Sequence, residues 1–176
     1  MTRKQKIAET AQRLFAERGY EQTSTQLIAR EAAVSEALIF KHFGSKEQLL
    51  DYIIKSGYKR IVEHNRGMLA DKDPLSLIYK VIDLPYKLVS DEPLFWRLQS
   101  KLTDMPFAQK QYERFIQPVN ILLFEAFSAL RYENPQKETA FLLLIVDAIW
   151  KKLATANTQG IPEMLTFIKG KYLLKS

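Results

Sequence analysis

Residues 34–50 read VSEALIFKHFGSKEQLL, and the helix signals in this stretch decide the fold. Ser35 is suited to cap a short helix that ends at Gly44, because serine oxygens accept hydrogen bonds from the free N–H groups of a first turn. Ser45 followed by Gln48 predicts a capping box, and therefore a longer helix that starts directly afterwards. The short helix must place many large side chains on about two turns.

Another helix precedes the short one, and the connection between the two is tight. Residues 23–25 are Thr-Ser-Thr, which offer N-caps for a helix that ends at Ala32, and Ala33 and Val34 lead into the next helix. This is the spacing of a helix-turn-helix. Since Val34 is apolar in a turn, we expect it to be buried between the two helices that it joins.

An N-terminal helix completes this small domain. Apolar residues at three-and-four spacing predict a helix from about Thr2 to Arg18, closed by Gly19. We expect one small core made of Ala11, Leu14, Phe15, Ile28, Ala29, Val34, Ile39 and Phe43.

The rest of the short helix must face outward, because six of its residues cannot all pack inward on two turns. Those residues are Glu36, Ala37, Leu38, Phe40, Lys41 and His42. The positive N-terminal end of this helix suits a row of phosphates, and the major groove of DNA is wide enough to admit it. The hydroxyls of Thr23, Ser24 and Ser35 flank this end, and Lys46 follows at the start of the next helix. Ser35 as a simple cap and the lysines as solvated surface residues remain the alternatives.

The remainder of the chain is also predicted to be helical, and each break contains a proline. The expected helices cover residues 45–67, 74–89, 92–102, 107–130, 135–157 and 162–174. The fold class is therefore all-α with about nine helices, divided into a helix-turn-helix domain of residues 1–44 and a larger helical domain of residues 45–176.

Composition excludes several classes of protein. The 176 residues are 47% hydrophobic with a net charge of +6 and include no cysteine, so thiolate sites are absent. The two histidines lie far apart in the sequence, so we expect no metal site, and we expect no cofactor either. Without a long apolar window or an N-terminal signal we expect a cytoplasmic chain with no membrane partner. No paired carboxylates, activated nucleophile or phosphate-binding glycine loop indicates an enzyme.

Residues 7–50 resemble the N-terminal DNA-binding domain of the TetR (tetracycline-repressor) family of bacterial transcription regulators. The residues that carry this resemblance are Ala11, Leu14, Phe15, Gly19, Tyr20, Thr23, Ser24, Ile28, Ala29, Ala32, Val34, Ser35, Phe43, Ser45, Lys46 and Leu49. Ala33 and Ala37 stand where the family often has glycine, so the turn must tolerate a Cβ and the short helix is stiffer. Phe40 replaces a frequent tyrosine and loses the phosphate contact of its hydroxyl.

The resemblance implies a homodimer that binds double-stranded DNA at a pseudo-palindromic operator. It assigns phosphate contacts to Thr23, Ser24, Ser35 and Lys46. Base edges would be read by Glu36, Ala37, Leu38 and Lys41, while Phe40 packs on sugar or protein and His42 bonds a phosphate or packs. Residues 1–48 hold eight Lys or Arg and six Asp or Glu, so affinity should depend on a few placed contacts rather than on a broad basic surface.

The resemblance also implies a small-molecule effector that controls repression. Aromatic and apolar residues cluster in the middle of the larger domain, either as ordinary core or as a pocket for an apolar or aromatic ligand: Phe95, Trp96, Leu98, Leu102, Met105, Phe107, Tyr112, Phe115, Phe124 and Phe127. Pro118 should kink its helix and open room beside Phe115 and Leu122. Ligand binding would then shift the helix that begins at Ser45.

The last two helices carry the expected dimer interface. Residues 140–153 are apolar nearly all round, so one face should pack in the domain and another against a second subunit, unless the helix is buried wholly in its own domain. The candidate interface residues are Leu142, Ile145, Val146, Ile149, Trp150, Met164, Leu165, Ile168 and Leu173. A helical adaptor that kept this fold without binding DNA is the rival interpretation.

Overall fold

The computed structural model describes residues 1–67 and 69–172, and within these ranges it contains nine α-helices and no strand. The helices are α1 (Arg3–Arg18), α2 (Thr25–Ala32), α3 (Glu36–Phe43), α4 (Lys46–His64), α5 (Pro74–Asp91), α6 (Pro93–Lys101), α7 (Pro106–Ala129), α8 (Pro135–Ala154) and α9 (Ile161–Lys171). The all-α prediction is confirmed, with helix ends within a few residues of those expected. Leu173 and Leu174 lie outside the described residues.

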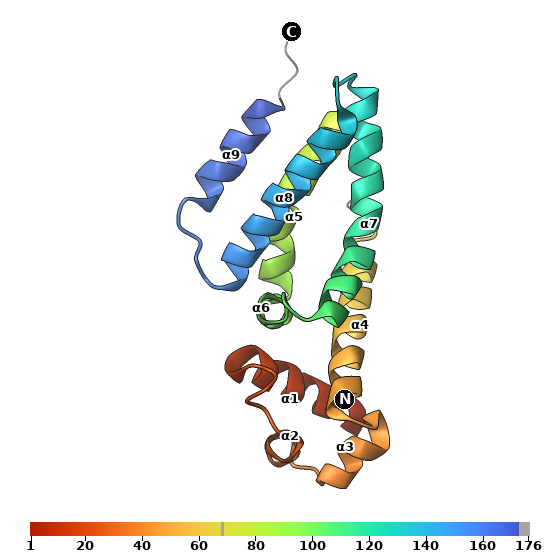
Figure 1. Ribbon diagram of the computed structural model, residues 1–176, viewed down its shortest axis with the longest axis vertical. Helices are drawn as coiled ribbons and strands as arrows, with labels where there is room; N and C mark the ends of the chain where they lie inside the picture. The colour runs from red at the N-terminus through yellow and green to blue at the C-terminus, as the bar shows by residue number, and fades with distance from the viewer. Residues whose placement is uncertain (68, 173–176) are drawn as a thin grey trace.

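The molecule is elongated, with α1–α3 at one end and α5–α9 at the other (Figure 1). The long helix α4 runs from α3 toward the C-terminal helices and lies beside α7. Its N-cap, Ser45, accepts a hydrogen bond from the Gln48 backbone N–H at 3.1 Å, as predicted. The reciprocal bond of a capping box, from the Ser45 backbone N–H to the Gln48 side chain, is not formed, so only this half of the prediction is confirmed. Gly44 ends α3 with φ 83°, so α3 and α4 are joined by a single sharp corner.

The three N-terminal helices share the small core that the sequence predicts. Ala11, Leu14 and Phe15 of α1 are buried together with residues of α2 and α3. Val34 is half-buried rather than fully buried. Ala33 adopts the left-handed conformation at φ 52° and ψ 50°, so the turn keeps its glycine-like geometry at a cost on the order of 1 kcal/mol.

The larger group of helices is built around α5, α7 and α8, which pack on one another. α6 packs on α1 and so connects this group to the N-terminal helices. The Lys101 ammonium, at the end of α6, donates to the Glu17 carbonyl oxygen in the last turn of α1 at 2.9 Å. In the part of the chain that the structure describes, no helix is long and apolar enough to cross a membrane.

Candidate nucleic-acid interface and ligand cavity

The outer face of α3 is exposed at the free end of the molecule. Ile39 and Phe43 are buried, which turns Ala37, Phe40 and Lys41 toward solvent. Phe40 is 45% exposed, which is a large fraction for an aromatic residue. The other three residues predicted to face outward, Glu36, Leu38 and His42, are half-buried, and Leu38 packs against the core, so the predicted outward face is confirmed only in part.

Glu36 has a partner that the sequence did not indicate. Its carboxylate accepts a hydrogen bond from the Thr25 hydroxyl at 2.5 Å, and both side chains are half-buried. This bond ties the first turn of α3 to the first turn of α2, eleven residues earlier. Glu36 therefore orients the helix in the free protein, and reading a base would require it to exchange this partner.

The serines at the two helix starts differ from each other. The Ser24 oxygen accepts from the Leu27 backbone N–H at 3.1 Å, so it caps α2 while remaining exposed. Ser35 occupies the N-cap position of α3, but its side chain makes no cap hydrogen bond to any described residue. The Ser35 hydroxyl is thus exposed and available to a phosphate at the positive end of α3.

Lys46 lies over an aromatic ring rather than fully in solvent. Lys46 is the first residue of α4, and its ammonium is 4.1 Å from the centroid of the Tyr20 ring. Burial and the neighbouring Glu47 carboxylate raise the pKa of Tyr20 to about 12, so the phenol stays neutral. The Tyr20 ring holds the Lys46 ammonium beside the turn that leads out of α3. His42 is half-buried, with its ring 6.2 Å from that of Phe43.

Thr23 does not fit its predicted role as a phosphate contact. It is fully buried, and its hydroxyl donates to the Gly19 carbonyl oxygen at 2.8 Å, close to the Leu14 carbonyl oxygen at 3.4 Å. Gly19 is the C-cap residue of α1 and Leu14 lies in the last turns of this helix, so the Thr23 hydroxyl binds at the C-terminal end of α1. Thr23 is therefore a structural residue that closes α1, and this prediction is corrected.

Replacing Thr23 with valine is expected to lower the free energy of unfolding by about 1–2 kcal/mol, because a buried carbonyl loses its donor. The affinity of the folded protein for DNA should stay unchanged. Urea denaturation and fluorescence anisotropy with a labelled duplex measure the two quantities. Thr23→Ser keeps the hydroxyl and serves as the control. A loss of affinity at unchanged stability would return Thr23 to the DNA contacts.

An apolar cavity of about 370 Å³ lies between the C-terminal end of α4, α5 and α7. The residues that line it are Ile61, Val62, Asn65, Arg66, Leu69, Ala70, Leu84, Leu88, Phe115, Pro118, Val119 and Leu122. Its size is at the lower end of the range for small-molecule sites. Phe115, Pro118 and Leu122 are the residues beside which the sequence predicts extra room.

Comparison with known proteins settles the family. Residues 7–53 match the profile described as bacterial regulatory proteins, tetR family. The chain is similar to the HTH-type transcriptional repressor AcnR of Corynebacterium glutamicum, with 28% identity over 178 residues that cover 95% of this chain and 90% of that protein. The chain belongs to the TetR family. It is a DNA-binding transcriptional regulator, and the matched proteins are regulators rather than enzymes.

Other relatives match part of the chain or its fold. The transcriptional regulator HbdR of Aromatoleum is 43% identical over 54 residues, which cover 31% of this chain and 24% of that protein. A TetR-like transcriptional regulator of Rhodococcus superimposes with a TM-score of 0.75 and 19% identity, covering 99% of this chain and 97% of that one. The fatty acid degradation regulator FadR of Bacillus halodurans gives 0.73 and 16%, covering 97% and 94%. At these identities the structures show a shared fold.

Most of the residues that the sequence predicts for the effector pocket of this TetR family chain do not line the apolar cavity. Phe95, Trp96 and Phe127 are fully buried core residues, and none of them lines the apolar cavity. Their rings pack against other helices, which leaves them no surface for a ligand. This corrects the prediction for all three.

The other predicted pocket residues are also displaced from the apolar cavity, except Phe115. Leu102 and Tyr112 line a different groove. Met105 is the N-cap of α7 and only partly buried. Phe124 is 46% exposed on the outside of α7. The sequence thus identified the helix that carries the cavity wall, but not the turns that face the cavity.

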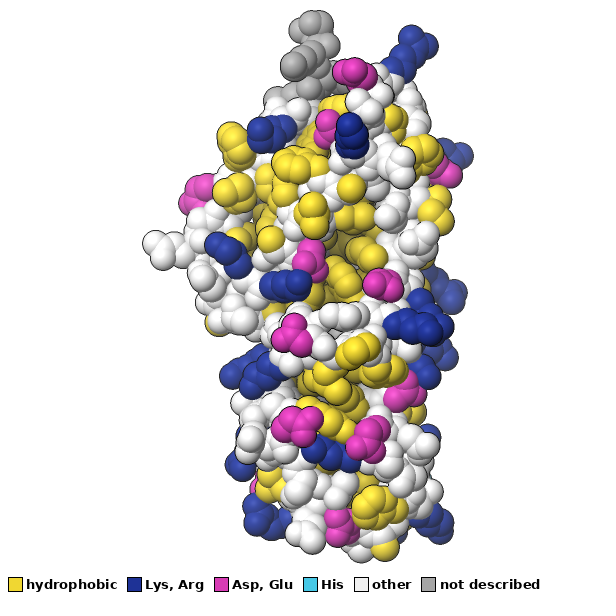
Figure 2. All heavy atoms as spheres, in the orientation of Figure 1, with side chains coloured by type: hydrophobic (Ala, Val, Ile, Leu, Met, Phe, Trp, Pro, Cys, Tyr) yellow, Lys and Arg dark blue, Asp and Glu magenta, His cyan; other side chains and the backbone are white. Residues whose placement is uncertain are grey.

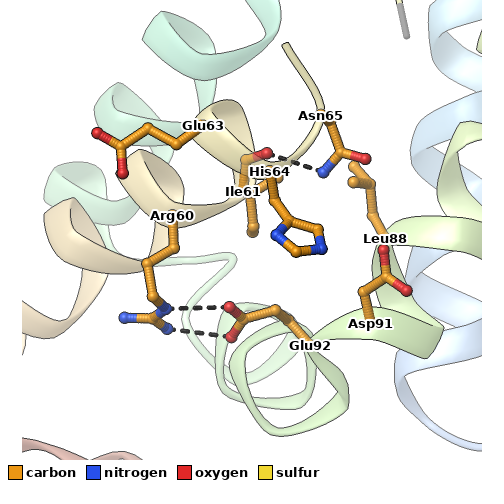
Figure 3. Close-up of a pocket in the computed structure, with 8 residues that line it drawn as sticks. All are labelled: Arg60, Ile61, Glu63, His64, Asn65, Leu88, Asp91 and Glu92. Carbon is orange, nitrogen blue, oxygen red and sulfur yellow. Dashed lines mark hydrogen bonds and ion pairs between the residues drawn. The ribbon is translucent and has the colours of Figure 1, made fainter. Parts of the chain in front are cut away.

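A polar pocket of about 480 Å³ borders the apolar cavity where α4, α5 and α6 meet (Figure 3). The Arg60 guanidinium donates two hydrogen bonds to the Glu92 carboxylate, each 3.0 Å long, and these bonds raise the pKa of Arg60. In Figure 3 the His64 ring lies between Glu92 and Asp91. The Arg60–Glu92 pair ties the last turns of α4 to the start of α6, because Glu92 directly precedes that helix.

The predicted dimer residues divide between the inside and the outside of the chain. Leu142, Val146, Ile149, Trp150, Leu165 and Ile168 are buried within their own subunit, so these six predictions are wrong for a surface contact. Ile145 is half-buried and Met164 is exposed. Leu173 lies outside the described residues.

A different set of apolar side chains forms the exposed surface of the last helices. Phe141 and Leu144 of α8 and Met164 and Phe167 of α9 are all about half exposed or more, and Leu144 reaches 70%. We call these four residues the outer apolar strip. In Figure 2, which has the orientation of Figure 1, hydrophobic side chains gather over the upper half of the molecule, where the C-terminal helices lie. Large exposed apolar patches of this kind mark interaction surfaces.

Proposed function

We propose that this regulator is a ligand-responsive repressor that binds a pseudo-palindromic operator as a homodimer and is released by a small apolar or aromatic molecule. One observation carries the proposal: a single helix, α4, connects the DNA-binding surface to the apolar cavity. Lys46 at its start follows α3 directly, and Ile61 and Val62 at its end line the cavity. A ligand that moves the end of α4 therefore moves the DNA-binding helices as well.

The DNA contacts are proposed on exposed and half-buried residues of the helix-turn-helix and of the start of α4. Ser24, Ser35 and Lys46 would bind phosphates. The two serines lie near the positive N-terminal end of α3, and Lys46 follows the C-terminal end of α3 at the start of α4. Lys41 would donate to guanine, and Ala37 and Leu38 would contact thymine methyl groups. Glu36 would accept from cytosine N4 after releasing Thr25. Phe40 would pack on sugar, and His42 would bond a phosphate.

The coupling between effector and operator is proposed to run through two connections. The Arg60–Glu92 pair moves α6 together with α4, and the bond between Lys101 and the end of α1 transmits that motion to the N-terminal helices. An apolar ligand would stabilise the arrangement of α4 and α6 in which the cavity buries more of the ligand's apolar surface. If the free energy of ligand binding differs by about 2 kcal/mol between the two arrangements, a size common for such couplings, the ligand changes operator affinity roughly thirtyfold.

The proposed dimer uses the outer apolar strip rather than the buried residues that the sequence indicated. α8 and α9 lie in the same half of the molecule (Figure 1), and both pack on α5. We propose that the same helices of a second subunit complete a four-helix bundle. Symmetric pairing would place two α3 helices on one side of the dimer. Each would then enter one of two successive major grooves.

Selection of bound duplexes from a random DNA pool tests the proposed function directly. The wild-type protein is expected to enrich an inverted-repeat sequence, whose half-site spacing reports the distance between the two α3 helices. The Lys46→Ala variant, checked for folding, should lose the enrichment at moderate salt. Failure of a folded dimeric wild-type protein to enrich any sequence contradicts operator binding and favours the adaptor.

Lys46 and Lys41 are expected to act differently on the selected operator. Lys46→Ala should weaken binding to all sequences alike and reduce the slope of log affinity against log salt by about one. Lys41→Ala should instead relax the preference at one base pair of each half-site, by about 1–3 kcal/mol per site. Lys55→Ala is the matched control, because Lys55 lies on α4 and pairs with Asp51 at 2.9 Å. Equal effects of the first two substitutions on operator and random DNA contradict these roles.

A further inference from the structure

Two lysines close to α3 have their ammonium groups over aromatic rings. Lys46 lies over Tyr20, with 4.1 Å between the ammonium nitrogen and the ring centroid. The Lys4 ammonium, from the first turn of α1, is 4.5 Å from the centroid of the Tyr52 ring and 5.4 Å from that of Phe43. The sequence assigned no role to Lys4, and its position beside α3 is a finding of the structure.

The rings under Lys4 belong to the two helices that meet at the sharp corner after α3. Phe43 is the last residue of α3 and Tyr52 lies in the second turn of α4, and their ring centroids are 5.3 Å apart. α1 packs on both helices, and its start lies beside the start of α4 in Figure 1. A capping box fixes this end of α1, because the Thr2 hydroxyl accepts from the Gln5 backbone N–H at 3.2 Å and the Gln5 side chain accepts from the Thr2 backbone N–H at 2.7 Å. The backbone that carries Lys4 is therefore well anchored.

The charges of these two lysines are not cancelled by a carboxylate. Among the residues that the structure describes, neither Lys4 nor Lys46 forms an ion pair. Arg13 of α1 and Lys55 of α4, by contrast, each lie within 3.4 Å of a carboxylate oxygen. A carboxylate offsets the charge of a lysine and takes up its N–H donors, whereas a ring face attracts the ammonium and leaves its charge and its other donors available. Both lysines are thus held in place and can still bind an anion.

A lysine that is already held loses less freedom when it binds. Lysine is among the side chains that lose the most rotamer entropy on ordering, and this loss normally opposes each phosphate contact. A ring that keeps the ammonium near one position has restricted part of this freedom before DNA arrives. A helix in the major groove lies between two phosphate backbones, so cations beside its end suit phosphates rather than base edges.

We propose that Tyr20 and Tyr52 are positioning residues for DNA binding, and that Lys4 is a further phosphate contact of this regulator. Tyr20 acts through Lys46, and Tyr52 acts through Lys4 together with the Phe43 ring. Because operator binding is itself proposed, these roles rest on it. The protein then presents two fixed cations beside α3 in place of two freely moving ones.

Two double-mutant cycles on the selected operator test these roles, with affinities measured by fluorescence anisotropy at several salt concentrations. Tyr20→Leu and Tyr52→Leu remove a ring and should each weaken binding roughly threefold. Tyr20→Leu should have no further effect in a Lys46→Ala background, and Tyr52→Leu none in a Lys4→Ala background. Lys4→Ala should also reduce the slope of log affinity against log salt by about one. Tyr20→Phe and Tyr52→Phe keep the rings and should bind like the wild type.

The outcomes separate these roles from the proposed function. Urea denaturation checks that each variant is folded, and the Lys4→Ala measurement does not depend on the folding of either leucine variant. A tyrosine whose replacement by leucine weakens binding equally with and without its lysine has only a structural role. Unchanged affinity and salt slope in Lys4→Ala exclude a phosphate contact by Lys4. Both results are obtained with a wild-type protein that binds its operator, so they leave the proposed function intact, whereas a folded wild type that binds no duplex contradicts both.

Discussion

Replacing Leu144 with aspartate is expected to split the homodimer and to lower operator affinity by about a hundredfold or more. Leu144 is the most exposed large side chain of the outer apolar strip, and the strip is the surface proposed for the partner. A two-fold axis repeats every contact, so one substitution places two unpaired carboxylates in the same interface. Burying an unpaired carboxylate costs several kcal/mol.

The loss of operator affinity follows from the loss of the dimer. Two linked α3 helices bind two half-sites with an effective concentration far above that of a second free subunit. A monomer with a formal charge of only +2 on residues 1–48 has few non-specific contacts to replace that gain. Half-site binding should therefore remain weak at physiological salt.

Sedimentation velocity and fluorescence anisotropy measure the two effects separately. Tyr86→Asp is the matched control, because it also places a carboxylate at an exposed large hydrophobic residue, 50% exposed, on α5 instead of the outer apolar strip. It should leave both the mass and the operator affinity unchanged. A Leu144→Asp protein that sediments as a dimer would exclude the outer apolar strip as the interface.

The N-terminal domain was predictable because its signals are local in sequence. Ser45, Gln48 and Gly44 act within one helical turn of each other, so the corner between α3 and α4 follows from their order alone. The same holds for Pro118, whose effect on its own helix indicated extra room beside Phe115 and Leu122.

Which residues of α8 face the core and which face solvent could not be predicted, because the helix is apolar on every side. Leu142 is fully buried and Leu144 is largely exposed, although both are leucines two positions apart in the same helix. Which of them faces the core depends on how α5 and α7 pack against α8, and that packing has no local signal. The same ambiguity placed Phe95 and Phe127 in the pocket when they belong to the core.

The polar partners of the candidate sites were missed for a related reason. Thr25 meets Glu36 across eleven residues, and Arg60 meets Glu92 across thirty-two. Neither pair has a helical spacing, so sequence inspection has no basis for joining them. Thr23 was misassigned because a hydroxyl beside a helix start suits a phosphate or a carbonyl equally well, and only its burial distinguishes the two.

Gly57→Ala is expected to lower the free energy of unfolding by about 2 kcal/mol, although alanine normally stabilises the interior of a helix by about 1 kcal/mol over glycine. A Cβ at position 57 would overlap the Phe95 ring, where α4 crosses α6. Phe95 has no room to move, because the Tyr58 and Trp96 rings lie 5.1 and 5.7 Å from it. Overpacking of about 3 kcal/mol therefore exceeds the gain in helix propensity.

Phe95→Leu distinguishes this explanation from a general intolerance of α4 to substitution. Leucine is smaller than phenylalanine, so the double variant Gly57→Ala, Phe95→Leu should be more stable than the sum of the two single losses predicts, by about 1 kcal/mol or more. Urea denaturation of all four proteins gives the coupling energy. Strict additivity would show that position 57 and the Phe95 ring do not share one packing site. Coupling of the expected sign would confirm Phe95 as the core residue against which α4 must pack closely, and would explain why only glycine fits at that crossing.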